Sequence, residues 1–126
     1  MPSNTEVIES FYADPANLLN LVDADVEWIT MPGIPYGGVH RGPDQVRQNV
    51  MRHVAADWEN FKSTLDTLME AGDDCIVALG RYSGTFKATG KTLADCDFAH
   101  IFRLRNGRIV QLRQYVDSAI FNAVMS

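Results

Sequence analysis

Residues 97–117 read DFAHIFRLRNGRIVQLRQYVD, and this stretch decides the fold. Two segments rich in β-branched and aromatic residues flank Asn106-Gly107. Asn-Gly readily adopts the positive φ angles of a tight hairpin turn, and strands favour β-branched and aromatic side chains. We therefore predict a long β-hairpin that turns at Asn106-Gly107.

One face of the first arm carries a histidine among apolar side chains. Strand alternation places on this face Cys96, Phe98, His100, Phe102 and Leu104. A buried imidazole without a hydrogen-bond partner costs about 1–3 kcal/mol. Two interpretations of His100 follow: a core histidine whose hydrogen bonds are satisfied, or a working group in a mostly apolar pocket.

The composition is that of a globular protein and argues against several partners. The 126 residues fit one domain, residues 1–126, with 46% hydrophobic and 21% charged residues. A net charge of −5 without a Lys/Arg cluster argues against nucleic-acid binding. No apolar run approaches the roughly 20 residues of a membrane span, and the N-terminus lacks the pattern of a secretory signal, so we expect a cytoplasmic protein that does not bind membranes. Cys75 and Cys96 have no zinc-site spacing, and we expect small buried thiols.

The first residues have helical signals. Ser3 and Glu6 match a capping box, and apolar residues follow at helical spacing, which predicts a helix over residues 4–13. Asp14-Pro15 ends this helix and can begin a short second one, because Asp caps helices well and Pro suits the first helical position.

A strand, a loop and a long helix are predicted next. Residues 26–31 fit a strand. Residues 32–38 are predicted to form a loop that carries Tyr36, because their Pro and Gly residues interrupt regular secondary structure. A long helix over about residues 43–59 is expected from a stripe at three- and four-residue steps, namely Val46, Val50, His53, Val54 and Trp58. His53 therefore lies on an otherwise apolar face.

The pattern changes to strands from residue 61 onward. Strands are predicted over residues 61–70 and 75–87, followed by the hairpin and a short closing helix over residues 118–125. Helices first and antiparallel strands afterwards are typical of an α+β domain whose helices cover one face of a curved sheet.

Four phrases carry a resemblance to a known superfamily: DVEWITMPG at residues 25–33, VHRGPDQV at 39–46, EAGDDCIV at 70–77 and FAHIFRLRNGRIVQLRQYVD at 98–117. They resemble the nuclear transport factor 2-like superfamily, and within it the SnoaL-like polyketide cyclases and ketosteroid isomerases. The resemblance implies a cone-shaped α+β fold, in which a curved antiparallel sheet wraps around the long helix and encloses a deep apolar cavity. The superfamily includes enzymes and proteins without catalytic activity, so the resemblance fixes the fold more firmly than the function.

The resemblance also implies which residues line the cavity. Its expected catalytic groups are His100, Tyr82 and Gln114. The expected substrate-binding residues are Met31, Tyr36, His53, Trp58, Phe86, Phe98, Phe102, Leu112, Val116 and Asp117. For Asp117 a second role is open, as the N-cap of the closing helix.

At two sets of positions this sequence lacks the catalytic residues of related enzymes, which reduces the number of reactions it could catalyse. Met31 occupies the position of the proton-shuttling aspartate of ketosteroid isomerases, while His100 occupies that of their oxyanion-stabilising acid. Gly80, Tyr82 and Gln114 stand where limonene-epoxide-hydrolase relatives have an Asp-Arg-Asp set. The resemblance therefore argues against steroid isomerisation and epoxide hydrolysis by those mechanisms.

Two functional hypotheses remain open. The first is isomerase, cyclase or dehydratase-type acid-base chemistry on a small, mostly apolar carbonyl compound of polyketide-like or steroid-like character. The second is a domain that binds a hydrophobic small molecule without chemistry. In contrast to both, a pure dimerisation module would have a filled cavity. Under both hypotheses we expect no metal or other cofactor, a small apolar ligand or substrate, and a homodimer.

Overall fold

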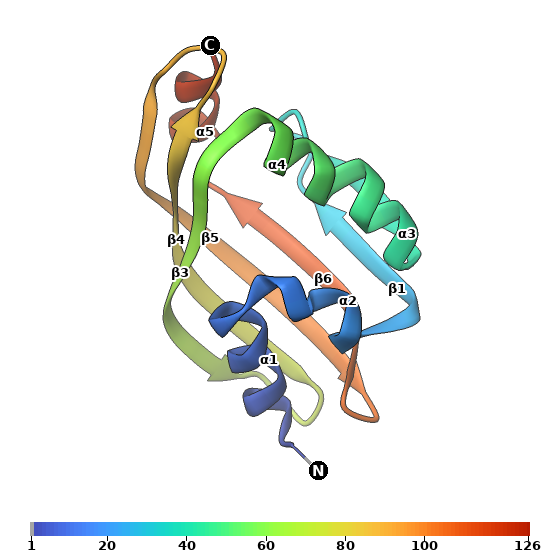
Figure 1. Ribbon diagram of the computed structural model, residues 1–126. Coiled ribbons are helices and arrows are strands. Elements are labelled where there is room, and N and C mark those ends of the chain that lie inside the picture. Colours follow the sequence, from blue (N-terminus) through green and yellow to red (C-terminus); the bar gives the residue numbers. More distant parts are fainter. Residues whose placement is uncertain (1) are drawn as a thin grey trace.

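The computed structural model describes residues 2–126 as an α+β fold built on one six-stranded sheet. The helical segments are α1 (Asn4–Ala13), the 3₁₀ turn η1 (Pro15–Asn17), α2 (Leu18–Leu21), α3 (Gly42–Val46), the π-helical turn η2 (Arg47–Met51), α4 (Arg52–Asp57) and α5 (Ser118–Met125). The strands are β1 (Val22–Thr30), β2 (Gly38–Arg41), β3 (Trp58–Glu70), β4 (Cys75–Phe86), β5 (Thr92–Arg105) and β6 (Arg108–Val116). Figure 1 shows α1 to α4 on the same side of the sheet.

The terminal helices begin and end as their local sequences predict. Ser3 and Glu6 form the capping box of α1, in which the Ser3 hydroxyl accepts from the Glu6 amide and the Glu6 carboxylate accepts from the Ser3 amide. Asp14 caps η1 through the Ala16 amide. Asp117 caps α5 by accepting from the Ile120 amide. The predicted helices over residues 4–13 and 118–125 are therefore confirmed.

The sheet has the order β2-β1-β6-β5-β4-β3. Neighbouring strands within the sheet are antiparallel except for β1 and β6, which run parallel. The predicted hairpin is confirmed: Arg105 pairs with Arg108, and Asn106 and Gly107 have φ angles of 52° and 75°. On β5, His100 lies between Ala78 of β4 and Gln114 of β6.

The region around the long helix differs from the prediction in three respects. Residues 38–41 form the short strand β2, which pairs with β1 and which the Gly-rich sequence concealed. The helix ends at Asp57, so Trp58 and Glu59 belong to β3 rather than to the helix. Within the helix the π-helical turn η2 separates α3 from α4.

The interior divides into two hydrophobic clusters. The aliphatic core lies between the sheet and α1 to α3 and contains mainly branched residues: Val7, Ile8, Phe11, Leu18, Val22, Val26, Trp28, Val46, Val50, Ile76, Ala78, Phe102, Leu104, Ile109 and Leu112. The aromatic cluster is contributed in part by α5 and consists of Tyr36, Trp58, Tyr82, Leu93, Cys96, Phe98, Phe121 and Val124. His100, which is 1% exposed, stacks on Phe98 of the aromatic cluster and meets Phe102 of the aliphatic core edge-on. The imidazole therefore lies at the boundary between the two clusters.

Candidate functional site

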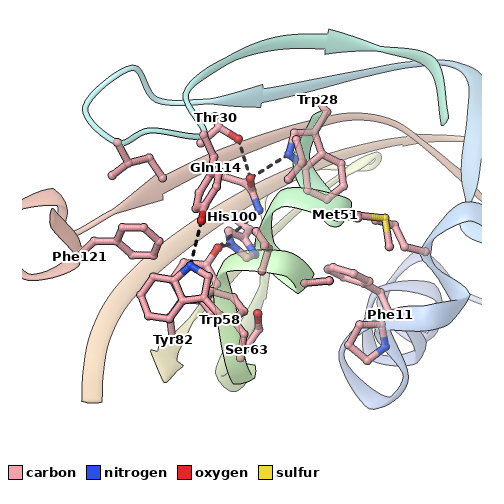
Figure 2. A pocket seen from close by; sticks show the side chains of 18 of the residues that line it. Phe11, Trp28, Thr30, Met51, Trp58, Ser63, Tyr82, His100, Gln114 and Phe121 are labelled. Carbon is pink, nitrogen blue, oxygen red and sulfur yellow. Dashed lines mark hydrogen bonds between the residues drawn. The ribbon is translucent and has the colours of Figure 1, made fainter. Parts of the chain in front are cut away.

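A cavity of about 470 Å³ opens between the sheet, the long helix and the N-terminal helices (Figure 2). Most of its wall is apolar or aromatic: Phe11, Pro15, Leu18, Trp28, Ile34, Tyr36, Val50, Met51, Val54, Ala55, Trp58, Phe61, Tyr82 and Phe121. The remaining lining residues are polar: Thr30, Asn60, Ser63, His100 and Gln114. A mostly apolar concave wall with a few convergent polar groups is the usual form of a small-molecule site.

Gln114 is held in one orientation by three hydrogen bonds, two to residues of β1 and one to a residue of β4. Its Oε1 accepts from the Trp28 indole Nε1 at 2.9 Å and from the Thr30 hydroxyl at 2.7 Å, as Figure 2 shows. Its Nε2 donates to the Tyr82 hydroxyl at 3.5 Å. Because an indole N–H can only donate, the Gln114 atom facing Trp28 must be the oxygen, and the amide nitrogen must face Tyr82.

His100 lies between two tyrosine hydroxyls. Its Nε2 is 2.5 Å from the Tyr82 hydroxyl, and its Nδ1 is 2.5 Å from the hydroxyl of Tyr12 at the end of α1. Both ring nitrogens therefore have hydrogen-bond partners. The inward direction that strand alternation predicted for His100 is confirmed, because the imidazole is buried and bonds Tyr82.

Burial controls the protonation of these three groups. Loss of solvation lowers the pKa of His100 from its usual 6.5 to about 3, so the imidazole is neutral near pH 7. Burial also raises the pKa values of the Tyr12 and Tyr82 hydroxyls, so both remain protonated. A chain of neutral hydrogen-bonding groups results, in the order Gln114, Tyr82, His100 and Tyr12.

A second polar group lies where the loop after β1 meets the end of α4. The Tyr36 hydroxyl donates to Asp57 at 2.8 Å and accepts from the Trp58 indole at 3.0 Å. Burial and the Asp57 carboxylate raise the pKa of Tyr36. Tyr36 therefore remains a protonated phenol, and its hydroxyl proton is already donated to Asp57 in a hydrogen bond.

The wall of the cavity contains no Asp or Glu among its lining residues in the described part of the chain. Across residues 2–126, no three His, Cys, Asp or Glu side chains lie close enough together to hold a metal ion. The groups that can act on a ligand are therefore neutral donors and acceptors, chiefly Tyr82 and Gln114, with His100 behind Tyr82.

Five of the predicted site residues line the cavity. They are the three expected catalytic residues, His100, Tyr82 and Gln114, together with Tyr36 and Trp58. Trp58 enters the wall from the first residue of β3 instead of from the long helix. The structure therefore brings the predicted polar groups together at one wall.

Three of the predicted residues lie behind the wall. Phe98 stacks on the His100 ring with centroids 4.0 Å apart. Gly80 pairs with Phe98 across the strands, and a Cβ at Gly80 would overlap the Thr64 carbonyl oxygen of β3 and the Phe98 ring, so the glycine allows both to approach. Phe102 and Leu112 are fully buried in the aliphatic core. Their inward direction was predicted correctly, but they support the site and do not line it.

Four further residues are at the edge of the expected site, and their predicted place in the wall is wrong. Met31 accepts a hydrogen bond from the Val116 amide through its sulfur, so these two residues hold the loop after β1 to the end of β6. Phe86 packs edge-on against Trp58. Asp117 is exposed and caps α5, which selects the second of the two roles that the sequence allowed.

His53 is a further correction, because its side chain is exposed and absent from the cavity wall. The helix face that lines the cavity carries Val50, Met51, Val54 and Ala55. Successive helical residues are about 100° apart, so His53 lies to one side of Val54. The π-helical turn η2, which ends at Met51, also interrupts the regular three- and four-residue spacing from which the prediction was made.

The wall residues Trp28, Thr30, Asn60 and Ser63 were not predicted from the sequence, and neither was Tyr12, which bonds His100 from behind the wall. Trp28 and Thr30 share an inward face of β1 with Val26, and this alternation was available as a signal. Tyr12 fits the apolar stripe of α1, and nothing in its spacing distinguishes a packing tyrosine from one that bonds a histidine 88 residues away.

No helix in residues 2–126 is long and apolar enough to span a membrane.

The comparisons with known proteins agree with this architecture. A family model described as SnoaL-like domain matches residues 10–112. An NTF2-like protein from Burkholderia thailandensis is 33% identical, with a TM-score of 0.92 over 100% of this chain and 99% of that chain. TerC, co-crystallized with polyporic acid, is 25% identical, with a TM-score of 0.85 over 97% of each chain. A protein of ketosteroid isomerase-like fold from Catenulispora acidiphila, in complex with trimethylamine, is similar in fold alone, at 23% identity and a TM-score of 0.75 over 87% of this chain and 84% of that chain. Curated proteins gave no match.

Proposed function

The chain belongs to the SnoaL-like domain family and has the NTF2-like fold, and from this premise we propose that it performs cofactor-independent acid-base chemistry on a small, mostly apolar carbonyl compound. The family and its fold include cyclases and isomerases, which makes proton transfer next to a carbonyl the natural chemistry to test. TerC, as a relative co-crystallized with an organic compound, supports the small-molecule part of this proposal.

One observation carries the proposal: the Tyr82 hydroxyl lies in an apolar cavity wall with hydrogen-bonding groups behind it. Gln114 donates to the Tyr82 oxygen at 3.5 Å, and His100 lies 2.5 Å from the same oxygen. When the proton of His100 is on Nε2, both groups donate to the phenol oxygen, and the phenol proton becomes a better donor to a third group. A substrate carbonyl that accepts from Tyr82 would be stabilised as it gains negative charge, and low polarity around the site strengthens this effect.

The same geometry limits the choice of substrate. His100 is a weak base, since burial lowers its pKa to about 3, and its two nitrogens already have partners. The cavity wall supplies no carboxylate base among the described lining residues. We therefore infer a substrate whose C–H bond is already activated, such as one flanked by two carbonyls or by a carbonyl and an aromatic ring. Water or a basic group of the substrate would take the proton, and Tyr82 would stabilise the enolate oxygen.

The second candidate function is binding of a hydrophobic small molecule without chemistry. The lack of a carboxylate among the described lining residues favours it. Under this alternative, Tyr82 and Gln114 would only orient the ligand.

An exchange experiment separates the two candidates. 2-Indanone is a small apolar ketone with activated C–H bonds, and its deuterium uptake from D₂O can be followed by NMR. We expect the protein to bind 2-indanone and to accelerate uptake, and Tyr82→Phe to lower the rate by about 10²–10³-fold, as removal of an oxyanion-stabilising donor does. Tyr115→Phe is the matched control, because Tyr115 is on the same sheet but 45% exposed and outside the cavity wall. Binding without acceleration would select the second candidate, and no binding would overturn both.

A further inference from the structure

Two tyrosines of the cavity wall, Tyr36 and Tyr82, have opposite kinds of polar group behind their hydroxyls. Behind Tyr82 is the amide nitrogen of Gln114, which donates to the phenol oxygen at 3.5 Å. Behind Tyr36 is the carboxylate of Asp57, which accepts the phenol proton at 2.8 Å. The donor behind Tyr82 leaves its proton for a ligand, whereas the acceptor behind Tyr36 takes its proton away from the cavity.

The hydroxyl of Tyr36 has one position left for a ligand. A phenol oxygen has one proton and two lone pairs. The proton is donated to Asp57, and one lone pair accepts from the Trp58 indole at 3.0 Å. A hydrogen bond to a charged acceptor is roughly twice as strong as one between neutral groups, so a neutral ligand does not take the proton from Asp57. Within the described part of the chain the second lone pair has no partner, and it can only accept.

The chain holds both partners of this hydroxyl in place. Asp57 is the last residue of α4 and Trp58 the first residue of β3, so the two partners are adjacent in the sequence. The Asp57 carbonyl accepts from the Lys87 amide at 2.9 Å, which fixes this junction to the end of β4. Tyr36 is only 9% exposed and Trp58 only 3%. The polarity of the Tyr36 hydroxyl is therefore set by the fold and not by solvent.

We propose that Tyr36 is a specificity-determining residue, which accepts a hydrogen bond from a ligand O–H or N–H while Tyr82 donates to the ligand carbonyl. The inference rests on the proposed function and deepens it. The Phe121 ring meets both phenol rings edge-on, with centroids 6.2 Å from Tyr36 and 6.4 Å from Tyr82, so both tyrosines border the same apolar part of the cavity. The ligand class is a mostly apolar carbonyl compound that carries a hydroxyl or N–H group at a second position.

The same arrangement rejects other groups at the second position. An ether or a second carbonyl would place an acceptor against the lone pair of Tyr36. An apolar group would remove water from this lone pair without replacing its hydrogen bond, which costs more than the hydrogen bond itself contributes. Asp57 strengthens the preference for a donor, because a phenol that donates to a carboxylate becomes a better acceptor.

Ligands without a carbonyl test Tyr36 separately from Tyr82. p-Cresol and 4-methylanisole are apolar rings of similar size with one oxygen each, but only p-cresol can donate a hydrogen bond. Calorimetric titration gives the ratio of their dissociation constants for each protein, and comparing proteins cancels the different hydration of the two ligands. The wild type should favour p-cresol about tenfold more than Tyr36→Phe does. Tyr115→Phe, which is altered outside the cavity wall, should keep the wild-type ratio.

A substitution behind the wall gives a second measurement with Tyr36 intact. Asp57→Leu removes the acceptor of the Tyr36 proton, which then becomes available to the cavity. We expect the ratio to move towards 4-methylanisole by about tenfold, because Tyr36 can now donate to its ether oxygen. Asp57→Glu keeps a carboxylate and should keep the preference for p-cresol. A merely structural role of Asp57 would weaken both ligands equally and leave the ratio unchanged.

The outcomes separate this inference from the proposed function. An unchanged ratio in both Tyr36→Phe and Asp57→Leu would overturn the inference, and so would folded wild type that binds neither p-cresol nor 4-methylanisole. If 2-indanone exchange is accelerated while the ratios stay equal, the proposed function stands and the role of Tyr36 falls. If the preference for p-cresol depends on Tyr36 but 2-indanone is neither bound nor exchanged, Tyr36 selects a donor and the carbonyl chemistry falls.

Discussion

The two hydrophobic clusters of this protein differ in shape and in chemistry. The aliphatic core is made mainly of Val, Leu and Ile between the sheet and the N-terminal helices, and most of its members lie away from the cavity, although Phe11, Leu18, Trp28 and Val50 line it. In the aromatic cluster, Tyr36, Trp58, Tyr82 and Phe121 each present part of their surface to the cavity. Branched aliphatic side chains interdigitate and fill space, whereas large flat rings meet at angles and leave volume between them.

The difference shows how one small domain can combine stability with a binding site. Tyrosine and tryptophan also carry hydroxyl and indole groups, so the cluster that leaves space also supplies polar groups to its wall. His100 at the boundary is held by Tyr12 on the side of α1 and by Tyr82 of the aromatic cluster. Three experiments test whether the two clusters have separate roles.

The largest effect on the free energy of unfolding is expected from removing one aromatic ring from each cluster. Phe102→Ala should lower the free energy of unfolding by about 3–5 kcal/mol, because it creates a new hole in a filled core. Phe121→Ala should cost clearly less, since one side of this ring already faces the cavity. Urea unfolding followed by tryptophan fluorescence measures both. Equal losses would show that the aromatic cluster is packed as tightly as the aliphatic core.

The second effect concerns the neutral imidazole at the boundary and its dependence on pH. The folded protein keeps His100 neutral down to about pH 3, whereas the unfolded chain binds this proton below about pH 6.5. Stability from this group is therefore complete above pH 6.5 and is lost as the pH falls towards 3, with a loss of about 3 kcal/mol at pH 4. The free energy of unfolding, measured between pH 7 and 4, should fall less steeply in His100→Gln than in the wild type.

His53→Gln is the control for this pH experiment, because His53 is exposed. It should follow the wild-type curve. If His100→Gln follows that curve as well, the buried imidazole is not what links stability to pH.

The smallest effect on stability is expected outside both clusters, on the outer face of the sheet. Leu79 and Tyr115 are 38% and 45% exposed there and border a shallow groove. We expect this face to be covered by a second copy of the chain. Leu79→Lys should change the free energy of unfolding of the monomer by less than about 0.5 kcal/mol, yet shift a dimer towards monomer in sedimentation equilibrium. A monomeric wild type would contradict this expectation.

The sequence predicted those elements whose signals are local. A capping box defined α1, Asp117 defined α5, and Asn106-Gly107 defined the hairpin. Alternation along β5 gave the direction of His100, and the resemblance to the superfamily then placed Tyr82 and Gln114 beside it.

Alternation could not predict how deep each inward residue lies. His100 and Phe102 share one face of β5, yet only His100 reaches the cavity, because the helices cover the sheet unevenly along its length. The irregular pairing of β4 with β5 after Tyr82 also changes the course of the strand before Phe86. Tyr12 was missed for a related reason: its partner is distant in the chain, and distance in space is set by the completed fold.

The parallel pairing of β1 with β6 determines when during folding the site can form. Val22 pairs with Ile109 and Trp28 with Leu112, so the first strand finds its central neighbour only near the end of the chain. Contacts between such distant residues form late, because a long loop must close first. During synthesis, Trp28 and Thr30 therefore leave the ribosome long before Gln114 exists to receive their hydrogen bonds. The nascent N-terminal half should carry exposed apolar surface until β6 is complete, and the wall of the cavity should be among the last parts of the molecule to assemble.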